Sequence, residues 1–306
     1  MPTAVEKDKT YNAGMMLNKA RGLSNNLDQT KADELMQIAF VMKGKRSIFE
    51  CREVCQILCR SKFSSAESYA LLANTYLGGL GDENKARPVA QYLDKALKLN
   101  PHSSYANTVM ALFAMEEGRF EDASKWSDKA IACPNPIAHA FQLKASALAN
   151  LGRDKEAIAV LDKTPLSKQE HEPAYYRIRG NILENLKRYK EAAEAYRKAL
   201  SMGERDLIKF RLVHSLELSG DIPEAIKEID KVIAHNPKDG EAYRTRAMLK
   251  VKSKDLAGAI KDYDQCLAME PTARTYRQRA ELHQQLGHKE LAAKDLAEAQ
   301  KIEDRI

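Results

Sequence analysis

The chain has 306 residues, of which 44% are hydrophobic and 30% charged, a balance typical of a folded and well-solvated protein. Only 14 Gly and 10 Pro occur, few for a chain of many strands and turns, whereas Ala, Leu, Lys and Glu are plentiful and favour helices. The net charge of +6 arises from 49 basic and 43 acidic side chains, so it permits an acidic partner but does not by itself indicate nucleic-acid binding.

The N-terminal region is predicted to be an unstructured segment followed by irregular helices. Residues 1–10 are polar, contain no apolar run that ends in a cleavage site, and are predicted to be disordered without acting as a signal peptide. Apolar spacing predicts helices over 11–24, 30–43 and 47–61. We expect residues 11–65 to form a degenerate repeat or a cap for the helices that follow.

Five cysteines occur, and three of them lie on one face of the helix predicted at 47–61. Cys51, Cys55 and Cys59 recur at four-residue intervals, too local for a disulfide framework, and no CxxC pair typical of zinc is present. Small apolar packing is favoured over a metal site, because buried thiols behave as small hydrophobes. Free thiols are typical of a reducing compartment, and no run of 18 apolar residues occurs. We expect a cytoplasmic protein without a cofactor, a metal or a membrane segment.

From residue 118 onward, one short phrase recurs six times. A Gly or a basic residue is followed by Ala, then an aromatic or aliphatic residue, then a second Ala or its equivalent, as in KRYKEAAEAYRKA at 187–199. Successive copies of the first alanine are 34, 35, 33, 34 and 33 residues apart. These alanines are Ala123, Ala157, Ala192, Ala225, Ala259 and Ala292. Such regularity indicates a protein built from repeats.

This pattern resembles the tetratricopeptide repeat, a helix-turn-helix unit of about 34 residues. In that register the first helix has a bulky residue at position 4 and a small one at 8, and the second has Ala at 20, a bulky residue at 24 and often Pro at 32. The unit that begins near residue 240 has Tyr243, Ala247, Ala259, Tyr263 and Pro271 at these positions. The resemblance implies about seven units, which start near residues 66, 104, 138, 173, 206, 240 and 273.

The resemblance therefore implies an all-α fold, a right-handed α-solenoid of stacked helix-turn-helix repeats over 66–306. Small residues at positions 8, 20 and 27 let the two helix backbones approach, and bulky residues at 4, 11 and 24 fill the gap. No single unit buries its apolar face, so each unit stacks on the next. The first unit needs about four extra residues in the turn around Gly78, Gly79 and Gly81.

No catalytic motif is recognised in the sequence. The glycines at 78–81 lie between predicted helices and are not followed by Gly-Lys-Ser, the seven His are scattered, and no nucleophile-elbow sequence occurs. We predict that the chain is not an enzyme.

The most informative surface feature lies in the last four units. In the family, positions 2, 5, 9 and 12 of the first helix point into a concave groove. Three units share a Tyr-Arg-x-Arg phrase whose first arginine takes position 5, and a row of guanidinium groups suits carboxylates. The candidate partner-binding residues are Arg177, Asn181, Phe210, Arg211, His214, Arg244, Arg274 and Arg277.

Two interpretations of these arginines stay open. They line a groove for an acidic peptide, or their stems cover apolar ridges while their charges pair with local acids such as Glu184, Glu241 and Glu281. The second arginines of the phrase occupy a position that is usually aliphatic, which suggests structural pairing across units: Arg179, Arg246 and Arg279.

Two further comparisons with the family narrow the kinds of ligand that the groove would bind. One subgroup holds chaperone C-termini in a two-carboxylate clamp; Arg177 and Asn181 mimic its first pair, but Arg211, Glu241 and Thr245 depart from the rest, which argues against that clamp. The first three units carry neutral groove residues that would accept an apolar helix or pack on the N-terminal helices: Ala70, Asn74, Thr108, Leu112, Gln142 and Ser146.

Three functions follow from these patterns. The preferred one is a non-catalytic scaffold or adaptor that binds a protein or peptide, acidic in character, in the concave groove. The alternative is an architectural subunit that assembles into a larger complex or a homo-oligomer. RNA binding by a helical repeat is disfavoured, because interleaved Asp and Glu leave no block of positive charge.

Overall fold

The structure, a computed structural model, describes residues 12–77, 83–165, 173–203 and 207–304. Within these ranges the chain forms 17 α-helices and no strand, so the predicted all-α fold class is confirmed. The chain divides into two compact units, which we call unit 1 (Met1–Glu170) and unit 2 (His171–Ile306). Residues 1–10 and the turn at Gly78, Gly79 and Gly81 lie outside the described residues.

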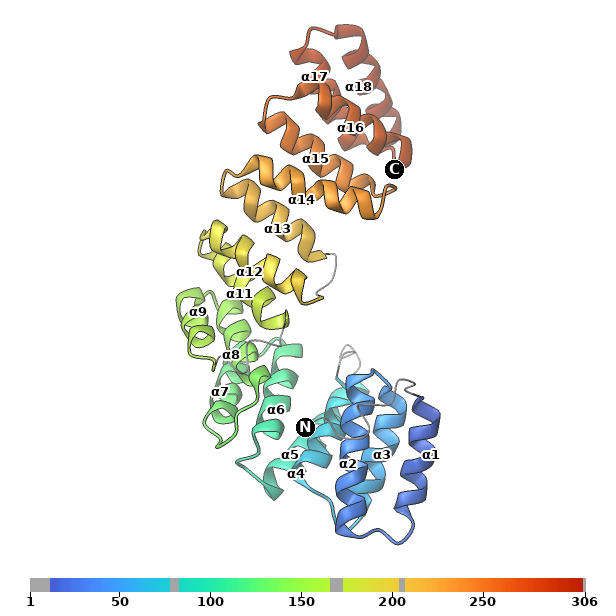
Figure 1. Cartoon of the computed structure of the whole chain (residues 1–306), viewed down its shortest axis with the longest axis vertical. Helices are drawn as coiled ribbons and strands as arrows, with labels where there is room; N and C mark the ends of the chain where they lie inside the picture. The colour runs from blue at the N-terminus through green and yellow to red at the C-terminus, as the bar shows by residue number, and fades with distance from the viewer. Residues whose placement is uncertain (1–11, 78–82, 166–172, 204–206, 305–306) are drawn as a thin grey trace. The chain divides into compact units, whose positions relative to one another are not determined.

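Unit 1 opens with three helices that pack on one another and on the helix that follows (Figure 1). Asn12 and Asp28 cap the first two, because each side chain accepts a hydrogen bond from a backbone N–H three residues on, at 3.1 and 2.9 Å. The apolar faces meet in a core that contains Cys51 and Cys55, both fully buried, with Cys59 packed against it. The helices are α1 (Ala13–Ser24), α2 (Gln29–Gly44) and α3 (Ile48–Arg60).

The rest of unit 1 consists of consecutive helix pairs. Each helix packs on its sequence neighbour, and α6 also packs on both α4 and α8. Gly118, with φ +71°, provides the left-handed turn between α6 and α7. The helices are α4 (Ala66–Asn74), α5 (Glu83–Leu99), α6 (Ser104–Glu116), α7 (Phe120–Ile131), α8 (Ala138–Asn150) and α9 (Asp154–Asp162).

Unit 2 repeats the same arrangement in four helix pairs, and each helix packs on the next along the chain (Figure 1). The helices are α11 (Pro173–Asn185), α12 (Tyr189–Ser201), α13 (Leu207–Leu218), α14 (Ile222–His235), α15 (Gly240–Lys252), α16 (Leu256–Met269), α17 (Ala273–Gln285) and α18 (Lys289–Glu303).

The small residues of the repeat allow close packing within each pair. The six recurring alanines at position 20 are all at most 2% exposed. In the pair α11–α12, Gly180 at position 8 faces Tyr196 at position 24, and a Cβ added to Gly180 would lie 2.5 Å from the Tyr196 ring. Tyr196 is fully buried, so the bulky position of one helix fills the space that the small position of the other leaves open.

Candidate protein-binding surface and the ion pairs beside it

The predicted groove residues of unit 2 all lie on the first helices of their pairs. Arg177 and Asn181 belong to α11, Phe210, Arg211 and His214 to α13, Arg244 to α15, and Arg274 and Arg277 to α17. Arg211, His214, Arg274 and Arg277 are exposed, and the others are half-buried. The prediction that these residues bind a partner stays a prediction, but their contacts define what such a surface offers.

Three of the arginines already hold carboxylates of the same chain. The Arg211 guanidinium donates to Glu184 Oε2 at 2.8 Å, and Arg244 Nε donates to Glu241 Oε2 at 2.8 Å. These hydrogen bonds raise the pKa of both arginines above its usual value. The local pairs expected from the sequence with Glu184 and Glu241 are therefore present.

The third pair was not expected. Arg277 on α17 donates to Glu303 Oε2 on α18 at 2.6 Å. Glu303 lies 26 residues further along the chain, so no short-range spacing pointed to it. The antiparallel packing of α17 and α18 brings the end of one helix beside the start of the other.

Two other candidates have contacts within unit 2. The Tyr196 hydroxyl donates to Asn181 Oδ1 at 2.8 Å, so the oxygen of this amide supports the buried tyrosine while its NH2 group retains donors. Burial is the main cause that raises the pKa of Tyr196 above its usual range. His214 Nδ1 lies 3.4 Å from Glu217 Oε2.

The second arginines of the Tyr-Arg-x-Arg phrase have a structural role, as predicted, in the last two pairs. Arg246 makes two hydrogen bonds to Asp262 of its own pair, at 2.9 and 2.6 Å, and a third to Asp230 of the preceding pair, at 2.7 Å. Lys250 adds a fourth contact, 2.8 Å from Asp262. The Asp262 side chain is only 4% exposed. Two cations, Arg246 and Lys250, therefore contact a nearly buried carboxylate, and Arg246 also holds the neighbouring Asp230.

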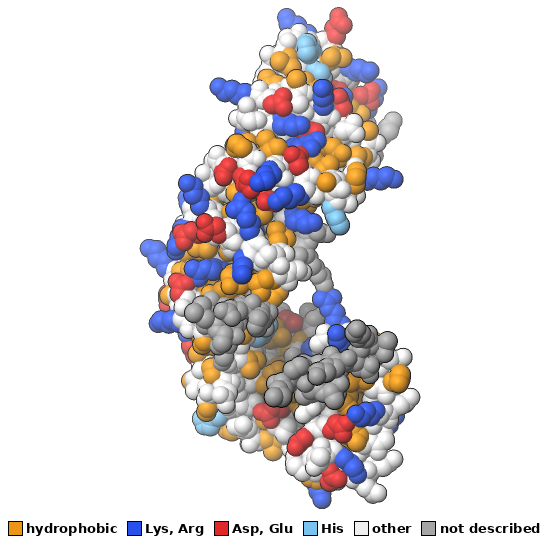
Figure 2. Space-filling model, viewed as in Figure 1, with side chains coloured by type: hydrophobic (Ala, Val, Ile, Leu, Met, Phe, Trp, Pro, Cys, Tyr) orange, Lys and Arg blue, Asp and Glu red, His pale blue; other side chains and the backbone are white. Residues whose placement is uncertain are grey.

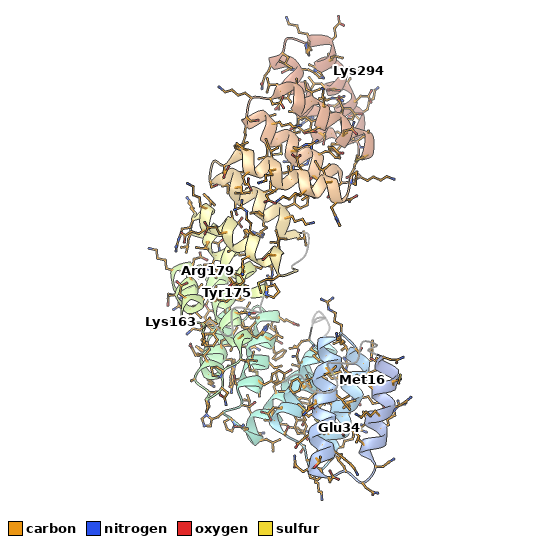
Figure 3. All side chains as sticks on the ribbon, viewed as in Figure 1. Met16, Glu34, Lys163, Tyr175, Arg179 and Lys294 are labelled. Carbon is orange, nitrogen blue, oxygen red and sulfur yellow. The ribbon has the colours of Figure 1, made fainter. Side chains whose placement is uncertain are left out.

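Arg279 repeats this arrangement one unit later. It donates twice to Asp295 of its own pair, at 2.9 and 2.6 Å, and once to Asp264 of the preceding pair, at 2.5 Å. Arg179 occupies the same position on α11, where it and Tyr175 are labelled in Figure 3. The predicted pairing across units is confirmed for Arg246 and Arg279.

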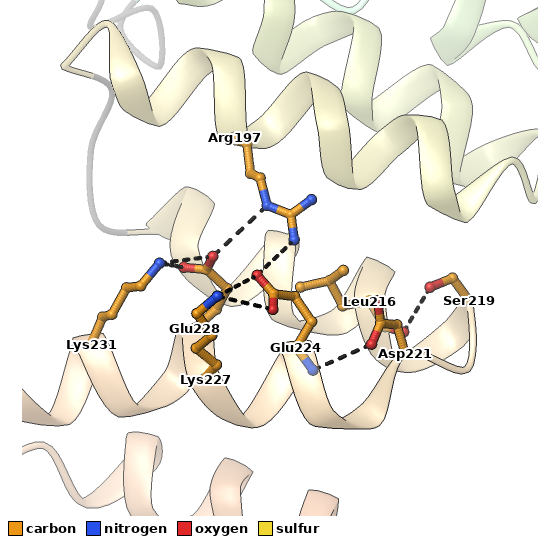
Figure 4. A network of polar contacts seen from close by, with 8 residues as sticks. All are labelled: Arg197, Leu216, Ser219, Asp221, Glu224, Lys227, Glu228 and Lys231. Carbon is orange, nitrogen blue, oxygen red and sulfur yellow. Dashed lines mark hydrogen bonds and ion pairs between the residues drawn. The ribbon is translucent and has the colours of Figure 1, made fainter.

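At the junction between α12 and α14 the charges are reversed: the preceding pair supplies the base and the following pair supplies the acids (Figure 4). Position 25 carries Arg197 there, in place of the aspartates Asp230 and Asp264 of later pairs. Its guanidinium lies 3.3 Å from Glu224 and 3.8 Å from Glu228, both on the following second helix. Leu212 stands at position 7, where Arg246 and Arg279 stand later. Each junction therefore joins opposite charges, but not always in the same order.

Charges of both signs alternate over the visible face of unit 2 in the space-filling view (Figure 2). Many of the described basic side chains of the unit have an acidic partner nearby, for example Lys231 with Glu228 at 2.9 Å.

Three of the six residues predicted to line a neutral groove in unit 1 are buried, and the other three, Asn74, Leu112 and Ser146, are half-buried. Ala70, Thr108 and Gln142, at position 5 of their units, are at most 2% exposed. Thr108 Oγ1 donates back to the carbonyl of Ser104 at 2.7 Å. These position-5 residues therefore do not line an open surface, and both uses foreseen for the neutral residues, binding an apolar helix and packing on the N-terminal helices, stay predictions.

No metal or redox site is evident among the described residues. They contain no cluster of three or more His, Cys, Asp or Glu able to hold a metal ion. Cys51, Cys55 and Cys59 lie in or against the core of α1–α4, as expected for small apolar packing, and burial raises the pKa of the Cys59 thiol to about 11. In the described part of the chain, no helix has both the length and the apolar character that crossing a membrane requires.

Comparison with known proteins agrees with this architecture. The sequence model of the tetratricopeptide repeat family matches residues 173–206. Among solved structures, the C-terminal part of a TPR repeat-containing protein from Cytophaga hutchinsonii superposes with a TM-score of 0.56 at 18% identity, over 77% of this chain and 95% of that one. Yeast Tom70 superposes with a TM-score of 0.51 at 17% identity, over 96% of this chain and 60% of that one.

Sequence relatives point to the same class. The Hsp70-Hsp90 organizing protein 1 of Glycine max is 26% identical over 193 residues, which are 59% of this chain and 32% of that protein. A TPR repeat-containing protein of Methanocaldococcus jannaschii is 29% identical over 165 residues, 50% of this chain and 28% of that protein. The chain thus spans about a third of the length of these relatives. The chain therefore contains a tetratricopeptide repeat at residues 173–206, and its fold is that of proteins built from such repeats.

Proposed function

We propose that this chain is a protein–protein interaction scaffold that binds an acidic segment of a partner along the first helices of unit 2. The observation that supports this proposal is the row of carboxylates held by Arg211, Arg244 and Arg277. Guanidinium groups bind carboxylates in a fixed planar geometry, so the same groups are suited to the acidic side chains of a partner.

Two of the internal acids do not prevent such binding, whereas Glu184, whose side chain is 10% exposed, stays paired with Arg211. Glu241 is 55% exposed and Glu303 is 37% exposed, and ion pairs at the surface contribute only about 0–1 kcal/mol. A partner that presents several carboxylates at once replaces these weak pairs without leaving an arginine unpaired. A sequence relative also supports an interaction role, since its name, Hsp70-Hsp90 organizing protein 1, describes the organization of two other proteins.

The experiment is affinity purification of partners from lysate with the full chain, followed by charge reversal of Arg177, Arg244 and Arg277 to Glu. Recovery of the partner should fall at least about tenfold, and binding of the wild-type chain should weaken with rising salt, because exposed charge pairs are screened. Arg→Gln variants at the same three positions test the loss of charge without a new repulsion.

A matched control reverses three cations of the second helices, Arg188, Lys227 and Lys231. These three cations are exposed, as Arg277 is, whereas Arg177 and Arg244 are half-buried. Each control cation is paired with a glutamate three residues away, and its reversal changes the net charge by the same amount. Circular dichroism must show that both triple variants stay folded. The proposal is wrong if both variants lose the partner equally, or if neither does.

A further inference from the structure

A cavity of about 440 Å³ lies in unit 1 beside Trp126, the only tryptophan of the chain. Its walls come from the end of α5 with Leu97, the turn with Pro101 and His102, α6 with Asn107, and α7 with Trp126 and Lys129. The volume lies within the range of about 300–1,000 Å³ that is usual for ligand pockets.

Trp126 stands at position 23 of its repeat, where three pairs of unit 2 have an acidic residue. Position 23 carries Glu228, Asp262 and Asp295 in unit 2, where these acids join neighbouring helices. An indole cannot form that ion pair. Trp126 instead stays half-buried and lines the cavity, with Lys129 Nζ 3.6 Å from the centroid of its ring. Tryptophan is among the residues that contribute most to binding energy at protein interfaces.

The polar groups of the cavity define what would complement it. The titratable residues that line it, among those described, are His102 and Lys129, and neither is acidic. Asn107 is 1% exposed, and its Nδ2 donates to the carbonyls of Pro101 and Ser103, both at 2.9 Å. Its Oδ1 is buried without a partner among the described residues. This oxygen has almost no accessible surface, so an occupant of the cavity cannot donate to it, and His102 and Lys129 are the polar side chains that decide the charge of an occupant.

We propose that this cavity is a second protein-binding site, which takes an apolar side chain next to an acidic residue of a partner segment. The apolar side chain would pack on Leu97, Pro101 and Trp126. The neighbouring carboxylate would pair with Lys129. The site is independent of the arginine row of unit 2, so the two proposals stand or fall separately.

The test uses the full chain and the capped peptide acetyl-Leu-Leu-Asp-amide. Because Trp126 is the only tryptophan, its fluorescence reports on this cavity alone. We expect a saturable change of emission and a matching heat of binding by calorimetry. The neutral peptide acetyl-Leu-Leu-Asn-amide, equal in size, should bind about two- to fivefold more weakly, the range for one partly exposed ion pair. The peptide acetyl-Ala-Ala-Asp-amide should not bind.

Two variants on α7 test whether the carboxylate of the peptide pairs with Lys129. Lys129→Met removes the ammonium but keeps the stem, so the Asp and Asn peptides should bind it equally. Lys125→Met is the control, because Lys125 lines a different cavity on the same helix, and it should leave the difference between the peptides unchanged. A heat of binding without a change of Trp126 emission would place the peptide elsewhere and overturn the proposal. So would equal effects of the two variants, or no binding at millimolar peptide.

Discussion

The two carboxylates that share Arg246 provide a direct test of how burial sets the strength of an ion pair. Asp262 is 4% exposed and Asp230 is 49% exposed, yet both accept hydrogen bonds from the same guanidinium at 2.6–2.9 Å. Asp262→Asn and Asp230→Asn remove the same charge and keep the shape of the side chain. The two variants therefore differ in the solvent around the lost contacts and in their number, because Asp262 is contacted twice by Arg246 and once by Lys250, whereas Asp230 accepts one hydrogen bond.

We expect a large difference between them. Removing one partner of a buried pair costs about 3–5 kcal/mol, and the lower end applies here because Arg246 and Lys250 are each 20% exposed and reach water. Loss of the exposed Asp230 pair should cost less than about 1 kcal/mol. With a urea slope of about 2 kcal/mol per molar, Asp262→Asn should lower the midpoint by about 1.5 M, and Asp230→Asn by less than about 0.5 M.

The assay is urea unfolding followed by circular dichroism, with amide hydrogen exchange of α15 and α16 to show that the loss is local to this junction. Arg246→Leu combined with Asp262→Leu should recover much of the stability, because an apolar pair replaces a buried ionic one at little cost. Equal midpoints for the two asparagine variants would refute the reasoning, since burial would then have no effect on the pair.

Two further predictions concern packing. Gly180→Ala should destabilise the protein by about 1–2 kcal/mol, because overpacking against the buried Tyr196 ring outweighs the gain in helix propensity. Gly22→Ala on α1, where an added Cβ meets no atom within 4 Å, should raise the melting temperature, and a rise for both variants would contradict the packing argument.

Iodoacetamide should modify Cys59 in the native protein at pH 8 at least about a hundredfold more slowly than in urea, because burial raises its thiol pKa to about 11 and leaves little thiolate. Rapid native labelling of Cys59, measured by mass spectrometry, would show that this thiol is accessible.

The repeated helix pairs could be predicted from the sequence because their determinants are local. The alanine at position 20 recurs at nearly constant spacing, and every copy from Ala123 to Ala292 is buried in the structure. In a repeat array each unit contacts mainly its neighbours, so a one-dimensional pattern carries most of the packing information. The number of repeats stays a prediction, since the family match covers a single unit.

The partners of the arginines could be predicted only in part. Glu241 was foreseen for Arg244 because the two lie three residues apart on one helix. Glu303 and Asp262 lie 26 and 16 residues from the arginines that they bind, on other helices, so their pairing depends on how far one helix slides along its neighbour. The cavity beside Trp126 was missed for a similar reason, because side chains from three helices and a turn determine its size.

The reversed charges at Arg197 make the order of the repeats in unit 2 matter. Loss of residues 240–272 would bring Asp230 to the place of Asp264, opposite Arg279, and the junction would again join an acid to a base. Loss of residues 206–239 would instead set Arg197 opposite Arg246, and Asp262, which stands at the repeat position of Glu228, would be left to pair with both guanidinium groups. The order of the repeats in unit 2 therefore decides whether a junction joins an acid to a base or joins two bases that share one acid.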